Sequence, residues 1–446
     1  MKSPAAFGLL AAVALLPLSA CSPPVSYDLV LRGGTIYDGS GDAAYAGDVA
    51  INGDAIVALG DLGNAKGTTE YDVTGLAVAP GFVNMMSWAN ASLIEDGRSQ
   101  SNIRQGVTLE VMGEGTSMGP LSDKMKEEFK SRQGDIQYDI EWTTLGEYME
   151  YLVERGISPN VASFIGAASP RWYVIGHEDR PPTPEELDQM RDLVRQAMEE
   201  GAVGIASSLM YPPGLFADTE ELIELSKVAS EYGGMYASHM RDEGAHMLEA
   251  IEELITIARE ANIRAEIYHL KSSGQPNWHL FDDAVQMVED ARAEGLAITA
   301  DVYTYPAGST GLNVTIPPWV QEGGFEKSLE RMSDPEIRAR IIKEMNEPSD
   351  EWENMFLMAG SPDNILLVNF KNDDLKPLTG KTLAEVAAMR GTSPEETAMD
   401  LIVEDGSRVG TVYFSQSEDI VRTAVAVSYT HLTLPTICFR GGAGGW

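Results

Sequence analysis

The chain has 446 residues, of which 43% are hydrophobic and 22% are charged, and this composition excludes a chain that is disordered throughout. With 32 Lys and Arg against 68 Asp and Glu, its formal net charge of −36 would repel a phosphate backbone, so we expect no nucleic-acid partner. Two cysteines, Cys21 and Cys438, are too few for a disulfide framework or a thiolate metal cluster.

The chain opens with a predicted secretory signal. An apolar run over residues 5–18 is too short to span a bilayer, and the sequence Leu18-Ser-Ala-Cys21 after it resembles a bacterial lipoprotein box. We therefore expect residues 1–20 to be a lipoprotein signal peptide and Cys21 to carry a lipid that anchors the protein in the periplasm or cell envelope. A plain signal peptide and an interfacial helix are the alternatives. No other segment is apolar enough to cross a membrane, so we expect membrane contact only through this anchor.

Residues 21–78 predict a small β domain. Short alternating strands are separated by glycine turns, and Asn52-Gly53 between two alternating runs is a hairpin signal. We expect this segment to fold as a small N-terminal β-sandwich.

Residues 79–427 predict an α/β fold, a (β/α)8 TIM-type barrel. Apolar runs alternate with helical patterns, as in a parallel sheet covered by helices. The seven expected strands cover residues 81–87, 107–113, 161–166, 202–207, 234–239, 264–269 and 296–303. Helices are expected at residues 184–200, 219–232, 246–261 and 281–294. The number of strands favours the barrel over the alternative, an open parallel sheet.

The last part of the barrel region is less regular. Residues 320–427 hold an acidic, helix-rich insertion, then a strand at 364–370 and helices at 381–390, 393–404 and 417–427. Residues 428–446 break this pattern, and Ser428-Tyr-Thr-His-Leu-Thr-Leu-Pro-Thr-Ile-Cys438 resembles a translated sequencing-adapter junction. We expect this tail to be foreign to the fold, with an atypical natural terminus as the alternative, and we expect the barrel to lack its eighth strand.

Three side chains with metal-binding chemistry follow the expected strands. Functional groups of a (β/α)8 barrel lie at the C-terminal ends of its strands, and this rule selects Glu114, His239 and His269. Three protein ligands with an open position are typical of a hydrolytic zinc site. Each residue alone could be a buried core histidine or a turn carboxylate, but the three at one end of a barrel favour a divalent metal.

Five segments carry a resemblance to a known family. They are Leu31-Arg-Gly-Gly-Thr-Ile-Tyr-Asp-Gly-Ser-Gly41, Ala79-Pro-Gly-Phe-Val-Asn84, Tyr236-Ala-Ser-His-Met-Arg-Asp-Glu-Gly244, Tyr268-His-Leu-Lys-Ser-Ser-Gly274 and Asp301-Val-Tyr-Thr-Tyr-Pro-Ala-Gly-Ser-Thr-Gly-Leu312. In this order, over about residues 27–427, they resemble the N-acyl-D-amino-acid deacylase (D-aminoacylase) branch of the amidohydrolase superfamily.

The chain departs from the family pattern at the metal site. The superfamily normally carries His-x-His just after Pro-Gly-Phe, where this chain has Met86-Ser-Trp88, so we expect no binuclear centre. The family's next ligand is a Cys in a glycine-rich turn, and Glu114 matches its position; a carboxylate can replace a thiolate on zinc. His239 and His269 match the other two ligands, and the resemblance therefore implies one zinc ion on these three residues.

The family's substrate-binding positions carry over as Lys271, Tyr303 and Ser309. The resemblance implies that Lys271 pairs with a substrate carboxylate, while Tyr303 and Ser309 donate hydrogen bonds to that carboxylate or to an oxyanion. A salt bridge with a nearby acid is the alternative for Lys271. The family's catalytic Asp, in a Gly-Ser-Asp motif after strand eight, has no match before Val427. We therefore expect this general base beyond Val427, and we expect the printed chain itself to be inactive.

The predicted function is the metal-dependent hydrolysis of a non-peptide amide C–N bond. A small-molecule N-acyl-D-amino acid would be cleaved to a carboxylate and a D-amino acid. The alternative is a non-catalytic surface-binding lipoprotein on a degenerate barrel. The loss of His-x-His favours that alternative, and the joint presence of Glu114, His239 and His269 opposes it.

Overall fold

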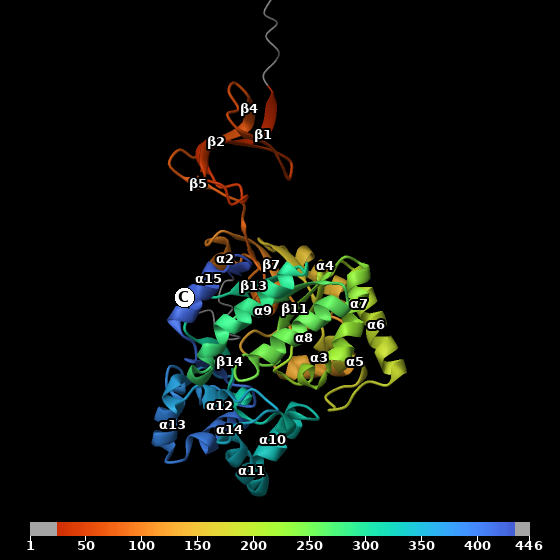
Figure 1. Cartoon of the computed structure of the whole chain (residues 1–446), viewed down its shortest axis with the longest axis vertical. Coiled ribbons are helices and arrows are strands. Elements are labelled where there is room, and N and C mark those ends of the chain that lie inside the picture. The colour runs from red at the N-terminus through yellow and green to blue at the C-terminus, as the bar shows by residue number, and fades with distance from the viewer. Residues whose placement is uncertain (1–24, 433–446) are drawn as a thin grey trace, which may run out of the picture. The chain divides into compact units, whose positions relative to one another are not determined.

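The computed structural model describes residues 25–432 in two compact units, the first ending at Gly81 and the second beginning at Phe82 (Figure 1). The expected signal peptide, the expected lipidation site Cys21 and residues 433–446 of the expected foreign tail lie outside the described residues. Within residues 25–432, no helix combines the length and the hydropathy needed to cross a membrane.

The first unit is a single mixed sheet in the order β3-β2-β1-β4, with β5 also paired to β1. Its strands are β1 (Ser26–Ile36), β2 (Tyr45–Asn52), β3 (Ala55–Gly60), β4 (Lys66–Asp72) and β5 (Ala77–Val78). The hairpin predicted at Asn52-Gly53 is confirmed, because β2 and β3 pair antiparallel with Asn52 opposite Ala55. Gly53 takes a φ of +57°, which an Asn-Gly turn requires at this position.

The expected β-sandwich is not what these residues form. With 11 residues, β1 is long enough to pair with β2 along one edge and with β4 and β5 along the other. All five strands therefore enter one sheet, and residues 25–81 leave no strand for a second one.

The second unit contains the parallel strands of the barrel, which form two sheets in the orders β6-β7-β8 and β9-β10-β11-β12-β13-β17. Their bounds are β6 (Phe82–Asn84), β7 (Val107–Met112), β8 (Asn160–Ser163), β9 (Ile165–Gly166), β10 (Gly204–Ser208), β11 (Met235–His239), β12 (Arg264–Ile267), β13 (Ile298–Val302) and β17 (Thr430–Leu432). β8 and β9 are the two halves of the strand expected at residues 161–166, interrupted at Phe164. The seven predicted strands are confirmed.

The expectation of a missing eighth strand is not confirmed, because β17 lies beside β13. The two strands pair parallel, with Thr430 opposite Ala300 and His431 opposite Asp301. Tyr429 is buried just before β17, and its backbone carbonyl accepts a hydrogen bond from the amide of Ala300. The first residues of the expected foreign tail thus contribute to the fold. Among the described residues β17 and β6 do not pair, so hydrogen bonds do not close the barrel at this place.

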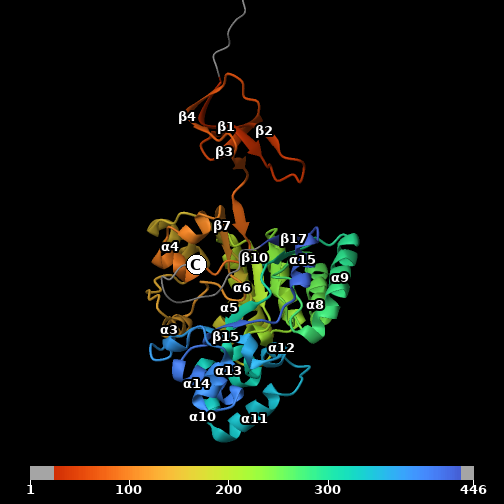
Figure 2. The same cartoon turned by 90° about the vertical axis from the view of Figure 1, so that its left-hand side faces the viewer.

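Helices cover the outer side of the strands, and α6, α7, α8 and α9 lie side by side there (Figures 1 and 2). The helices of this part are α1 (Asn90–Glu95), α2 (Gln100–Ile103), α3 (Asp123–Ser131), α4 (Leu145–Arg155), α5 (Ala168–Val174), α6 (Pro184–Glu199), α7 (Thr219–Glu231), α8 (Met247–Glu260), α9 (Phe281–Ala293) and α15 (Glu418–Ala426). The start of α6 illustrates why these helices form where the sequence predicts them. Thr183 caps the helix and makes a reciprocal capping box with Glu186, and Pro184 occupies the first helical position between them.

Successive strand residues pack on opposite faces of the barrel wall. Ile205 and Tyr236 belong to the core between strands and helices, whereas Ala206 and Ala237 belong to a separate inner cluster with Phe164. This alternation has the period of a β-strand, and it places Ala206 and Ala237 beside larger side chains such as Phe164 inside the barrel.

The acidic, helix-rich segment forms a small lobe, defined here as residues 308–413, with a hydrophobic core of its own. Its antiparallel sheet has the order β14-β16-β15. Its elements are β14 (Gly308–Gly311), α10 (Phe325–Ser333), α11 (Pro335–Met345), α12 (Met355–Met358), β15 (Ile365–Asn369), α13 (Leu383–Arg390), α14 (Pro394–Asp405) and β16 (Gly410–Tyr413). The strand and the helices expected between residues 364 and 404 are confirmed as β15, α13 and α14.

Candidate metal centre

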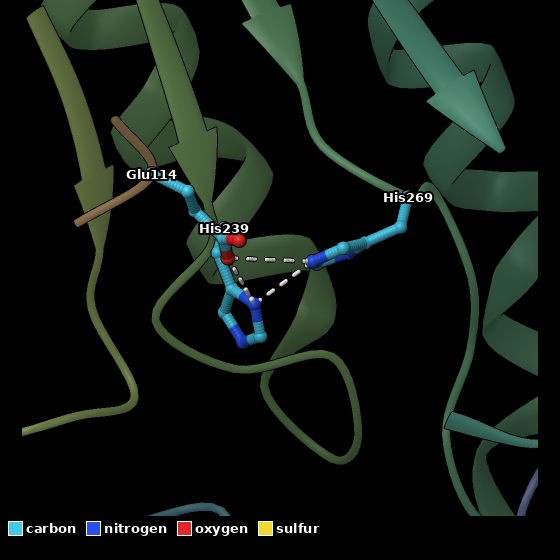
Figure 3. A group of neighbouring side chains, drawn as sticks. All are labelled: Glu114, His239 and His269. Carbon is cyan, nitrogen blue, oxygen red and sulfur yellow. Dashed lines mark hydrogen bonds and ion pairs between the residues drawn. The ribbon is translucent and has the colours of Figure 1, made fainter. Parts of the chain in front are cut away.

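The three predicted metal ligands lie together at the C-terminal ends of the barrel strands (Figure 3). Glu114 follows β7, His239 ends β11 and His269 follows β12. Nδ1 of His239 lies 3.3 Å from Oε1 of Glu114 and 2.9 Å from Nε2 of His269, and this last atom lies 3.8 Å from the same carboxylate oxygen. All three side chains are buried. We call these three residues the triad.

Glu114 is held in a tight turn between two glycines. Gly113 and Gly115 have φ angles of +104° and +65°, so residues with a side chain would be strained at both places. Trp88 donates a hydrogen bond of 2.7 Å from Nε1 to Oε2 of Glu114, which leaves Oε1 facing the two imidazoles. Trp88 stands where the superfamily carries the second His of His-x-His, and in this chain that position orients Glu114.

The backbone of His269 is unusual and is fixed by the neighbouring strand. His269 has a φ of +41°, a left-handed conformation that is uncommon for a residue with a side chain. Its backbone amide donates a hydrogen bond to Oδ1 of the buried Asp301, and the amide of Leu270 donates to the carbonyl of Asp301. Asp301 at the end of β13 therefore holds the turn that presents His269.

The charges of the triad are coupled. Burial opposes ionisation of Glu114, but contacts with the two imidazoles outweigh it and hold the pKa of this carboxyl well below its usual range. Burial lowers the pKa of His239. Burial acts in the same direction on His269, yet the carboxylates of Glu243 and Glu114 prevail and raise its pKa to about 9. A charged carboxylate thus faces two imidazoles inside the protein, an arrangement that suits a cation.

Lys271 and Glu243 form a buried ion pair beside the triad. Nζ of Lys271 lies 2.5 Å from Oε2 of Glu243 and 2.7 Å from Nδ1 of His269. Oε1 of Glu243 lies 2.9 Å from the same Nδ1, so one carboxylate contacts both Lys271 and His269. The structure therefore shows Lys271 in a salt bridge with a nearby acid, which was the alternative to its predicted substrate contact. The substrate role of Lys271 stays a prediction.

The structure places Tyr303 beside Lys271, whereas Ser309 lies on β14 in the small lobe. The ring of Tyr303 lies 5.7 Å from Nζ of Lys271, and its hydroxyl accepts a hydrogen bond from Gln416. Ser309 donates a hydrogen bond of 3.1 Å to the carbonyl of Thr411 in the neighbouring strand β16. Tyr303 thus adjoins Lys271, whereas Ser309 contacts the sheet of the small lobe.

Sequence reasoning missed three acids that surround the triad. Glu243 and Asp301 both stand in the segments that carry the family resemblance, so their place in those motifs was the signal that could have found them. Glu353 comes from the loop between α11 and α12 in the small lobe, and no local pattern marks it.

The triad fits a divalent metal ion. One carboxylate oxygen and two imidazole nitrogens lie within 4.8 Å of one another, all from buried side chains. Three such ligands satisfy a tetrahedral ion while leaving one position for water or substrate. Imidazole with carboxylate suits zinc and similar ions better than magnesium or calcium. The residues that the sequence selected can therefore hold the ion that the family resemblance implies.

No family model matches the chain, but it is similar to several known proteins. The D-aminoacylase of Alcaligenes xylosoxydans xylosoxydans is 37% identical over 290 residues, which cover 64% of this chain and 59% of that protein. The chain thus spans less than two thirds of the length of this curated relative.

Two solved structures are also similar. The crystal structure of a D-aminoacylase matches with a TM-score of 0.73 and 28% identity, covering 91% of this chain and 75% of the other. The N-acyl-D-glutamate deacylase of Bordetella bronchiseptica, solved with zinc and a phosphonate mimic of the tetrahedral intermediate, matches with a TM-score of 0.72 and 25% identity over 92% of this chain and 76% of the other. In sequence and in fold, the chain is therefore similar to the D-aminoacylases of the amidohydrolase superfamily.

Proposed function

We propose that this protein is a metal-dependent deacylase that hydrolyses an N-acyl-D-amino acid to a carboxylate and a D-amino acid. The observation that carries the proposal is the convergence of Glu114, His239 and His269 in one buried group. Similarity to a D-aminoacylase at 37% identity supports the substrate class. The alternative of a non-catalytic binding lipoprotein is not favoured, because these relatives are deacylases.

We propose that the triad holds one zinc ion. When bound, the ion would polarise the acyl carbonyl and lower the pKa of a water molecule. Lys271 would bind the substrate carboxylate as a point charge, with Tyr303 beside it as a hydrogen-bond donor. Ser309 would donate a further hydrogen bond to the substrate, and this role rests on the family resemblance alone.

The activity is tested with the protein expressed from the complete gene. We expect release of D-amino acid from N-acetyl-D-amino acids, at least about tenfold slower release from the L-isomers, and loss of activity after chelation with recovery on addition of zinc. Hydrolysis is measured as free amine formed. A protein that holds zinc but cleaves none of a broad panel of N-acyl-D-amino acids would contradict the proposal.

We propose that Cys21 is the lipid-bearing residue and that the protein is held at the cell envelope. The support is the sequence Leu18-Ser-Ala-Cys21 after the apolar run. The wild-type protein is expected to partition into the detergent phase and the Cys21→Ser protein into the aqueous phase. Equal partitioning of the two, or an intact N-terminus in mass spectrometry, would show that no lipid is attached.

A further inference from the structure

A second group of buried metal-binding side chains adjoins the triad. It consists of His239, Glu243 and Glu353, and one ligand atom from each lies within 4.8 Å of the others. The three residues are 6%, 2% and 5% exposed, respectively. Glu353 belongs to the small lobe, whereas the other two belong to the barrel strand β11 and the loop after it. We call these residues the Glu353 group.

Glu353 and His239 each carry buried atoms without a satisfactory partner. Neither carboxylate oxygen of Glu353 has a hydrogen-bond partner of ordinary geometry, although the charge of Lys271 and the backbone amide of Glu243 both favour its ionised form. Nε2 of His239 also has no partner. Burying a carboxylate without a counter-charge is costly, and a buried polar group left unpaired calls for an ion or a water molecule.

The two nitrogens of His239 serve different neighbours. Nδ1 faces Glu114 and His269, whereas the other ring nitrogen points away from both of them (Figure 3). An ion bound by the triad through Nδ1 therefore leaves Nε2 free for a second ligand position. One nitrogen with carboxylate oxygens is a donor set that zinc and similar ions accept.

We propose that the Glu353 group is a second divalent-cation position, which shares His239 with the triad. It is a different position from the one excluded by Met86-Ser-Trp88, because none of those residues takes part in it. Two features make cation binding at this position weaker than cation binding by the triad. Lys271 already neutralises Glu243 at 2.5 Å, and ions on both nitrogens of His239 require the ring to release its remaining proton to solvent.

The test is the number of zinc ions bound by the whole protein, measured by equilibrium dialysis and metal analysis in excess Mg²⁺. Magnesium occupies exposed carboxylates, which are numerous in a chain with a net charge of −36. We expect two zinc ions per wild-type chain, the second bound at least about tenfold more weakly than the first. Glu353→Gln should bind one ion with the first affinity nearly unchanged. Glu351→Gln, the same change at an exposed position two residues away, should still bind two.

Four results would overturn the proposal. A wild-type chain that binds one ion at saturating zinc would show that water or a proton satisfies Glu353. A Glu353→Gln chain that binds two ions would place the second elsewhere, and one that folds but binds none would make Glu353 part of the first site. An anomalous-scattering map of zinc-soaked wild-type crystals decides independently of any variant: a peak between His239 and Glu353 supports the position, and its absence contradicts it.

Discussion

Replacing His269 by alanine is expected to lower kcat/KM for an N-acyl-D-amino acid by about a thousandfold and to abolish tight zinc binding. His269 contributes one of the three triad donors, and its Nε2 lies 2.9 Å from Nδ1 of His239. Metal catalysis contributes several kcal/mol, and each 1.36 kcal/mol changes the rate about tenfold. Zinc content and kcat/KM are measured on the same preparation of protein from the complete gene.

The matched control is His279→Ala. His279 is exposed, and its ring contacts the carbonyl of Pro276, so the same substitution there should leave both zinc content and rate unchanged. If His269→Ala kept one tightly bound zinc ion and the wild-type rate, the triad would not be the metal site.

Replacing Glu243 by glutamine is expected to weaken zinc binding by the triad about 10–100-fold. Oε1 of Glu243 contacts Nδ1 of His269 at 2.9 Å, whereas the other ring nitrogen of His269 faces Glu114. A carboxylate in that place fixes the ring and makes its other nitrogen a better ligand. Glutamine keeps the size of the side chain and removes the charge. We therefore assign Glu243 a positioning role.

The zinc affinity of Glu243→Gln is measured by competition with a chromophoric chelator. Glu249→Gln, on the exposed face of α8, makes the same change of charge and should keep the wild-type affinity. Glu243→Asp retains the carboxylate and should recover part of the lost affinity. A Glu243→Gln protein that binds zinc within about threefold of wild type would limit Glu243 to its ion pair with Lys271.

The barrel and its triad were predictable from the sequence because both follow local rules. Strands buried on both faces read as apolar runs, and functional residues follow those runs directly, so Glu114, His239 and His269 could be selected without any structure. Their convergence follows because β11 and β12 are neighbours in one sheet and the sheet of β7 adjoins it.

The acids around the triad obey no such local rule. Glu353 reaches His239 only because the small lobe folds against the barrel strands, and this arrangement depends on contacts between distant segments. Asp301 was visible at the end of a predicted strand, but its role depends on the left-handed backbone of His269. The pairing of β17 with β13 departs from the prediction for a different reason: residues 428–438 resemble an adapter junction, and this resemblance predicts no strand there.

The triad also links the two sheets that meet at Phe164. Glu114 follows a strand of the sheet β6-β7-β8, whereas His239 and His269 belong to the other sheet, and the two sheets adjoin where β8 passes into β9 at Phe164. An ion held by all three side chains would therefore cross-link the two sheets at the place where they adjoin. Its removal would then loosen the first three strands before the rest of the barrel, so the mechanical rigidity of the wall would depend on metal supply.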